Sequence, residues 1–151
     1  MARKTKREQL YTPRKREVKQ TENGMLLIPT PMDVAEALRI PKKGELITVN
    51  QIRDLLSKKF SADYTCPMVT GIFINIIAGA SEENREYAEE VFPWWRVLKK
   101  NGLLSDKFPS TPDLQKGFLE SEGHIVWTGP TKRSKKLRVK DYENSLVKLQ
   151  S

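Results

Sequence analysis

The chain has 151 residues, of which 38% are hydrophobic and 30% are charged, enough for one core of ordinary size and too few for two full domains. A single cysteine, Cys66, excludes an internal disulfide and a zinc site made of cysteines alone, and it fits a reducing compartment. The first residues lack the apolar stretch of a signal peptide, and no apolar run approaches transmembrane length. We therefore expect a cytoplasmic monomer that needs no membrane, metal or cofactor.

The net charge of +8 is concentrated at the two ends of the chain. Residues 1–20 carry eight Lys or Arg against two Glu, and residues 130–151 carry seven against two acidic residues. Residues 21–129 carry twelve basic against fifteen acidic side chains. Basic ends can neutralise phosphates and release counterions, which gives a salt-sensitive affinity for nucleic acid. Solvated, disordered ends that only aid solubility are the equally weighted alternative.

Two helix starts are encoded in the first third of the chain. Residues 1–24 contain few apolar side chains and predict a largely disordered basic arm. Thr30-Pro31-Met32-Asp33 combines an N-cap threonine, a proline at the first helical position and an acid at the third, which predicts a helix to Arg39. Thr48-Val49-Asn50-Gln51 is another capping box and predicts a second helix to about Lys59.

A third helix should begin at Pro67 and end near Ala78, because Gly79 follows. Two capped helices with a short connection are what a helix-turn-helix requires, although such pairs occur in many small helical proteins. The acidic segment 81–90 would be repelled by phosphate, so it should point away from any DNA.

The last third predicts a wing and one more helix. Residues 96–98 and 103–104 flank the Lys100-Asn101-Gly102 turn and predict a β-hairpin. Thr111-Pro112 should open a helix that Gly123 ends, before a basic tail over residues 130–151. The predicted fold class is mainly α with a small β-hairpin, a winged helix-turn-helix-like single domain over residues 25–129.

Four stretches over residues 40–124 resemble, in the same order, the O6-alkylguanine-DNA alkyltransferase family. Residues 40–48 are similar to the Ile-Pro-x-Gly-x-Val-x-Thr stretch that opens the family's DNA-binding domain, with one extra lysine. Pro93-Trp94-Trp95-Arg96-Val97 stands at the Pro-Cys-His-Arg-Val acceptor motif, and Lys100-Asn101-Gly102 at the turn after it. Gln115, Leu119 and the Glu122-Gly123-His124 string are similar to the closing Gln-x-x-x-Leu-x-x-Glu-Gly.

The resemblance implies a helix-turn-helix that binds the minor groove while the target nucleotide is rotated into a pocket, because a guanine oxygen cannot be reached inside the stack. In active members a histidine–glutamate relay makes the acceptor cysteine a thiolate. Here Trp94 and Trp95 replace the cysteine and the histidine, while Glu122 keeps the glutamate position. An indole has no nucleophilic sulfur, so alkyl transfer at this position is excluded. The chain therefore resembles an alkyltransferase-like protein that reads DNA and has no catalytic residue there.

We expect the lesion pocket to be formed by Trp94, Trp95, Arg96 and Glu122, with one tryptophan in the core and the other in the pocket wall. Arg96 should bridge to Glu122 and so form the scaffold of the pocket. The family's arginine finger has no counterpart, which leaves Met68 as an apolar wedge. The residues expected to contact DNA are Thr48, Gln51, Pro67, Met68, Thr70, Gly71, Asn75, Lys99 and Lys100.

Three functions remain open from the sequence. The first is a non-enzymatic protein that recognises alkylated guanine in double-stranded DNA and flags it for a protein of a repair pathway. The second is an enzyme that uses Cys66 as a displaced alkyl acceptor, for which His124 is the only histidine available as a base. The third is a winged-helix module that binds DNA, RNA or protein without lesion recognition. Loss of the arginine finger favours the third function, and retention of Glu122 and the tryptophan pair favours the first.

Overall fold

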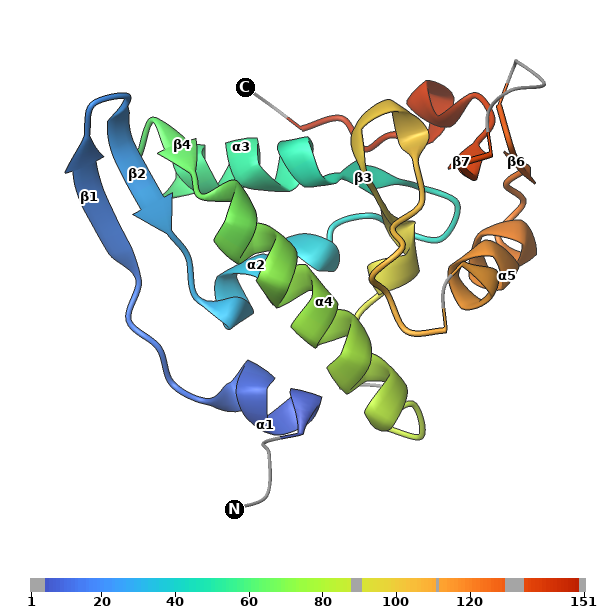
Figure 1. The fold of residues 1–151 in the computed structure, drawn as a ribbon, viewed down its shortest axis with the longest axis horizontal. Helices are drawn as coiled ribbons and strands as arrows, with labels where there is room; N and C mark the ends of the chain where they lie inside the picture. Colours follow the sequence, from blue (N-terminus) through green and yellow to red (C-terminus); the bar gives the residue numbers. More distant parts are fainter. Residues whose placement is uncertain (1–4, 88–90, 111, 130–134, 150–151) are drawn as a thin grey trace.

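The structure, a computed structural model, describes residues 5–87, 91–110, 112–129 and 135–149. Helices surround one long central helix, α4, and short strands join distant parts of the chain (Figure 1). No helix in the described ranges is both long and apolar enough to span a membrane. The elements, with η marking 3-10 helices, are α1 Lys6–Tyr11, β1 Glu17–Thr21, β2 Gly24–Ile28, α2 Pro31–Leu38, β3 Ile47–Thr48, α3 Val49–Lys59, β4 Tyr64–Thr65, α4 Pro67–Glu83, η2 Trp94–Arg96, β5 Val97–Leu98, η3 Lys100–Gly102, α5 Asp113–Ser121, β6 Val126–Trp127, β7 Arg138–Val139 and η4 Tyr142–Ser145.

Both predicted capping boxes are present. The Thr30 hydroxyl accepts the Asp33 N–H at 3.1 Å, and the Asp33 carboxylate accepts the Thr30 N–H at 3.0 Å. The Thr48 hydroxyl and the Gln51 side chain form the same reciprocal pair at 3.1 and 3.0 Å. These local bonds satisfy N–H groups that the first helical turn leaves unpaired, which is why α2 and α3 begin where the sequence predicts.

The central helix α4 is longer than expected. It continues through Gly79 to Glu83, so the prediction that Gly79 ends it is wrong. A Cβ at Gly79 would lie 2.7 Å from Cγ of Lys6, on the helix α1 that packs across α4. This glycine therefore permits a close approach between two helices and does not terminate either of them.

The N-terminal segment is folded from Thr5 onward, not a disordered arm. Leu10 of α1 is fully buried in the main core. Strands β1 and β2 form an antiparallel hairpin, and β2 pairs with β4 in parallel. The basic C-terminal segment is also part of the domain, because Leu46 donates to the Ser145 carbonyl and accepts the Val147 N–H, both at 2.8 Å.

The predicted wing is reduced to a tight turn. The Lys99 N–H bonds to the Leu103 carbonyl at 2.8 Å, but no strand pair follows, because β5 instead pairs in parallel with β3. Asn101 has a left-handed φ of 64° inside this turn. The antiparallel hairpins lie elsewhere, at β1–β2 and β6–β7.

Candidate nucleic-acid interface

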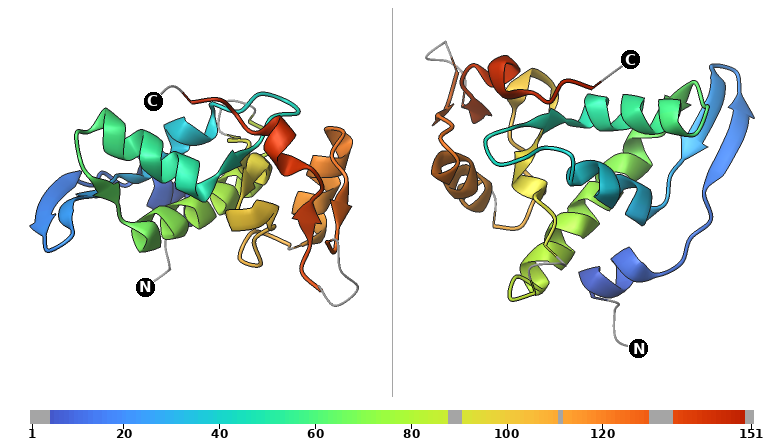
Figure 2. Two further views of the ribbon diagram at one scale, coloured as in Figure 1. Left: turned by 90° about the horizontal axis from the view of Figure 1, so that it is seen from above. Right: turned by 180° about the vertical axis from the view of Figure 1, so that it is seen from behind.

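A cavity of about 430 Å³ lies between the starts of α3 and α4 and the segment 97–108. Figures 1 and 2 show this segment, in yellow, between α4 and the orange and red C-terminal part of the chain. The cavity is mostly apolar, and its volume is within the range of small-molecule sites. It is lined by Val49, Asn50, Pro67, Met68, Gly71, Ile72, Ile74, Asn75, Val97, Leu98, Lys99, Lys100, Ser105, Lys107 and Phe108.

The exposed face of α4 at the cavity mouth is apolar. Met68 is 73% exposed and Ile72 49% exposed, one helical turn apart. Gly71 lies between them, and a Cβ built on it meets no atom within 4 Å. Residues 67–75 include no charged side chain, and apolar side chains such as Met68 and Ile72 can insert between bases.

Three lysines lie on one wall of the apolar cavity, the segment 97–108. Lys99, Lys100 and Lys107 are exposed, and their ammonium groups form no ion pair within the described ranges. Unpaired ammonium groups beside a groove are suited to phosphate contacts. Lys99 and Lys100 were expected here from the sequence, whereas Lys107 was not.

Trp94 does not line the cavity, which corrects its predicted place in the pocket. Its side chain is fully buried, and its indole N–H donates to a carboxylate oxygen of Glu82 at 3.0 Å. The ring lies edge-on to Phe108, with centroids 5.2 Å apart. Since Phe108 lines the cavity, Trp94 supports that wall from behind.

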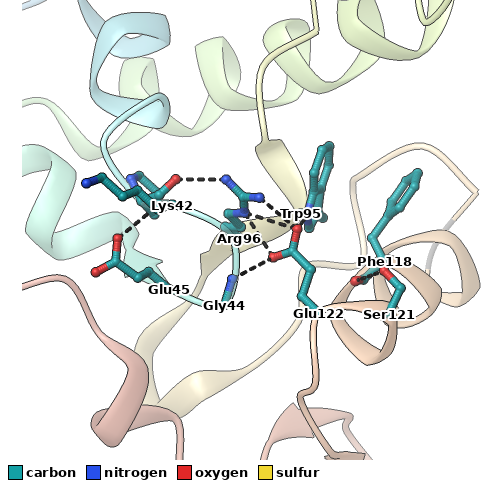
Figure 3. A network of polar contacts seen from close by, with 9 residues as sticks. Lys42, Gly44, Glu45, Trp95, Arg96, Phe118, Ser121 and Glu122 are labelled. Atoms are coloured by element: carbon teal, nitrogen blue, oxygen red, sulfur yellow. Dashed lines mark hydrogen bonds and ion pairs between the residues drawn. The ribbon is translucent and has the colours of Figure 1, made fainter.

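Trp95, Arg96 and Glu122 form a polar clasp beside the cavity (Figure 3). Glu122 accepts the Trp95 indole N–H at 2.9 Å and two Arg96 nitrogens, Nε at 2.9 Å and Nη2 at 2.8 Å. Arg96 Nη1 donates to the Pro41 carbonyl at 2.8 Å, and the Gly44 N–H points to Glu122 at 3.3 Å. The predicted Arg96–Glu122 bridge is confirmed. The clasp joins the loop before β3 to the end of α5. None of the three clasp side chains, Trp95, Arg96 and Glu122, lines the cavity.

The clasp fixes the charge of Glu122. Burial alone would raise the pKa of Glu122, but hydrogen bonds from Arg96, Trp95 and the Gly44 N–H outweigh it and leave the pKa below its usual value. Burial lowers the pKa of His124, against the opposing effect of Glu122. At neutral pH the clasp therefore holds one carboxylate against one guanidinium, beside a neutral imidazole.

Three of the residues expected to contact DNA have structural roles instead. Thr70 is fully buried, and its hydroxyl donates to the Cys66 carbonyl at 2.7 Å. The Thr48 hydroxyl caps α3, and the Gln51 amide donates to the Val147 carbonyl at 3.0 Å. These side chains lie at helix starts, where capping competes with any ligand for the same polar atoms. Pro67, Met68, Gly71, Asn75, Lys99 and Lys100 do line the cavity.

The cavity wall formed by Ser105, Lys107 and Phe108 was not predicted from the sequence. This wall comes from residues 103–110, which have no helical or strand periodicity. The only sequence feature that could have indicated this wall is a phenylalanine and a lysine in an irregular segment between a tight turn and a helix.

Cys66 is half-buried and does not line the cavity. No described group of three or more His, Cys, Asp or Glu is placed to hold a metal ion.

No known family model matches the sequence, and no curated protein is significantly similar. Solved structures with a similar fold include S. pombe Atl1 in complex with damaged DNA containing O6-carboxymethylguanine, and S. pombe ATL in complex with DNA. Each aligns with a TM-score of 0.54 and 18% identity, over 79% of this chain and 94% of the other. The chain therefore has the fold of the S. pombe alkyltransferase-like protein, as its four sequence stretches predicted.

Proposed function

We propose that this protein is a non-enzymatic DNA-binding protein that holds an O6-alkylated guanine in the cavity between α4 and residues 97–108. The observation that carries the proposal is an apolar cavity placed between an exposed apolar helix face and a rim of unpaired lysines. The fold shared with Atl1, which is solved with alkylated DNA, supports the same reading.

Each part of this interface has a physical task. The lysines contact phosphates and provide affinity that does not depend on base sequence. Met68 and Ile72 fill the space that an extruded nucleotide leaves in the stack, as apolar wedges do in other minor-groove proteins. The aliphatic side chains of the cavity accept the alkyl group, and Phe108 gives the extruded base an aromatic ring to pack on.

The same cavity has no thiol among its described lining residues, and a thiol is the acceptor in the family's active members. None of its described lining residues is Cys, His, Asp or Glu. Trp94, at the position of the family's acceptor, is buried behind Phe108. We propose that the protein marks the lesion for a separate repair protein, because binding alone leaves the alkyl group in place.

The direct test compares two duplexes that differ by one O6-methylguanine. We expect the parent protein to bind the modified duplex more tightly, and intact mass analysis after incubation to show no added methyl group. Equal affinity for both duplexes would favour the winged-helix module without lesion recognition. A stoichiometric methyl adduct on Cys66 would instead establish alkyl transfer.

Two glycines give a matched pair of variants for the cavity mouth. Gly71 of α4 and Gly117 of α5 are both helical, and a Cβ on either meets nothing within 4 Å. Gly71→Leu and Gly117→Leu should each stabilise their helix by up to about 1 kcal/mol. Only Gly71→Leu should weaken DNA binding, because its side chain enters the interface. A Gly71→Leu variant that binds like the parent would place the DNA elsewhere.

Phe108 tests the cavity wall itself. Stacking of a base on an aromatic ring is worth roughly 1–3 kcal/mol, so Phe108→Leu should weaken binding of the modified duplex by about 5-fold to 150-fold. Plain duplex should bind nearly as before. Phe118→Leu is the control, because Phe118 packs against Trp95 outside the cavity. Equal losses from the two variants would contradict a stacking role for Phe108.

A further inference from the structure

A second cleft, of about 420 Å³, lies on the other side of the turn that forms the cavity wall. It shares Lys99 and Ser105 with the first cavity, so the two hollows are separated only by the segment 99–105. Its opposite wall comes from residues 135–137, which lie outside the four stretches that resemble the alkyltransferase family. It is lined by Lys99, Leu103, Leu104, Ser105, Asp106, Pro112, Lys135, Lys136 and Leu137.

Backbone bonds fix the two walls of this cleft to each other. The Leu104 N–H donates to the Leu137 carbonyl at 3.0 Å, and Leu103 forms an antiparallel bridge with Arg138. Arg138 and Val139 in turn pair with β6. The lysines at 135 and 136 therefore stand next to a hydrogen-bonded ladder and are held close to Lys99.

The cleft has an excess of cations. Lys99, Lys135 and Lys136 are exposed, and none forms an ion pair with another described residue. Asp106 is the only acid among the described lining residues. The Ser105 hydroxyl accepts the Lys107 N–H at 3.1 Å, so its own proton can be donated to a ligand. Three ammonium groups and a hydroxyl donor are the chemistry that binds an anionic oxygen.

We propose that this second cleft binds a backbone phosphate of the DNA strand whose alkylated nucleotide occupies the first cavity. The proposal rests on the function proposed above. A base and the phosphate beside it are covalently linked, and the two hollows share a wall, so one strand can occupy both. The C-terminal segment thus adds a phosphate site to the helix-turn-helix, and this site contributes affinity without reading sequence.

The first test removes the two lysines on the far wall. Lys135→Ala combined with Lys136→Ala should weaken binding of modified and plain duplex by about the same factor, on the order of tenfold at moderate salt. The slope of log affinity against log salt should become shallower by about 0.9, the contribution of one lost phosphate contact. Lys58→Ala combined with Lys59→Ala removes the same charge at the far end of α3 and should change affinity less than twofold.

The second test locates the phosphate. Single methylphosphonates, which are neutral, replace the phosphates around the O6-methylguanine one at a time. At one or two positions, a methylphosphonate should weaken the binding of that duplex to the parent protein. The same methylphosphonate should not weaken its binding to the variant that carries both Lys135→Ala and Lys136→Ala. Absence of such coupling at every position, or an unchanged salt slope in the variant, would overturn the proposal.

The two proposals can fail separately. A parent protein that binds modified and plain duplex equally contradicts lesion recognition, while the salt slopes of parent and variant on plain duplex still test the cleft. Conversely, if the parent prefers the lesion and the variant keeps the parent's salt slope, lesion recognition is supported and the proposed phosphate site is overturned.

Discussion

The N-terminal layer, residues 5–28, and the cavity face, residues 97–108 with 135–138, are both rich in Lys and Arg but differ in what those cations contact. In the N-terminal layer, Arg16 pairs with Asp33 at 2.7 Å and Arg14 lies over the Phe73 ring at 5.4 Å. Lys19 contacts Glu17 at 3.2 Å. On the cavity face the five lysines at 99, 100, 107, 135 and 136 form no ion pair with a described residue.

This difference separates two uses of positive charge. Cations that are paired within the protein stabilise the fold, and they are not free to neutralise phosphate. Cations left unpaired beside a cavity can neutralise an anionic ligand, and they attract it from a distance. The expectation that the two basic ends provide salt-sensitive affinity for nucleic acid therefore becomes a more specific prediction, in which the cavity face dominates.

Next to each region, one buried carboxylate is held by an arginine. Asp33 and Glu122 have side chains that are each 7% exposed. Burial alone would raise the pKa of Asp33, but hydrogen bonds from Arg16 and Thr30 leave it below its usual value, as the clasp does for Glu122. Their partners differ, since the Arg16 side chain is 40% exposed and that of Arg96 only 13%.

The strongest test of the N-terminal layer is Leu10→Ala. Leu10 is fully buried between α1 and the core, so its truncation should lower the free energy of unfolding by about 3 kcal/mol. Urea denaturation measures this loss, and the folded fraction should bind DNA with the parent's affinity. An unfolding free energy within about 0.5 kcal/mol of the parent value would mean that this layer is not part of the cooperative fold.

Arg16→Ala should cost less, about 2 kcal/mol at pH 7, because Asp33 loses a charged hydrogen-bond partner but keeps its bonds to Thr30. The stabilisation depends on ionised Asp33, whose pKa is depressed in the folded state. It is therefore complete above the unfolded pKa of about 3.9 and is lost as the pH falls through the lower folded value. The difference between parent and variant in urea melts should therefore shrink as the pH falls below about 3.9. A difference that stays constant between pH 7 and pH 2 would show that the contact is not ionic.

On the cavity face, Lys99→Ala combined with Lys100→Ala should leave stability within about 0.5 kcal/mol of the parent. Affinity for modified and plain duplex should fall together, by about tenfold at moderate salt, with a shallower salt dependence. Fluorescence anisotropy over a salt series measures both quantities. A loss confined to the modified duplex would place these lysines in lesion recognition instead of phosphate binding.

The smallest effect is expected from Lys15→Ala combined with Lys19→Ala in the N-terminal layer. This variant removes as much charge as the cavity-face variant, yet DNA affinity should change less than twofold, because these lysines line neither hollow. A loss as large as that of the Lys99, Lys100 variant would erase the contrast between the two regions.

Features encoded by neighbouring residues could be predicted from the sequence. The capping boxes at Thr30 and Thr48 use residues three positions apart, and both form. The Arg96–Glu122 bridge was predicted from the acceptor-like motif and the closing glutamate, and it forms as a forked pair. In each case the partners are specified by a short pattern or by a motif of fixed order.

Features that depend on distant packing could not be predicted. The parallel pairs β2–β4 and β3–β5 join residues about 40 and 50 positions apart, and strands of two residues leave no periodic signal. The N-terminal layer has too few apolar residues to fold alone and is ordered by packing on α4. The orientation of Trp94 depends on Phe108 and Phe118, which approach it from later segments of the chain.

The burial of Trp94 limits which substitutions this position tolerates. A Trp94→Cys substitution would empty the volume of an indole from the core, a change that costs roughly 3–5 kcal/mol when a tryptophan is truncated. That loss is comparable to the whole stability of many small domains. The new thiol would also lie behind Phe108, away from any ligand in the cavity. Building a Cys-His acceptor pair at positions 94 and 95 would therefore also require a repacked core, and a single substitution at position 94 would not place a thiol in the cavity.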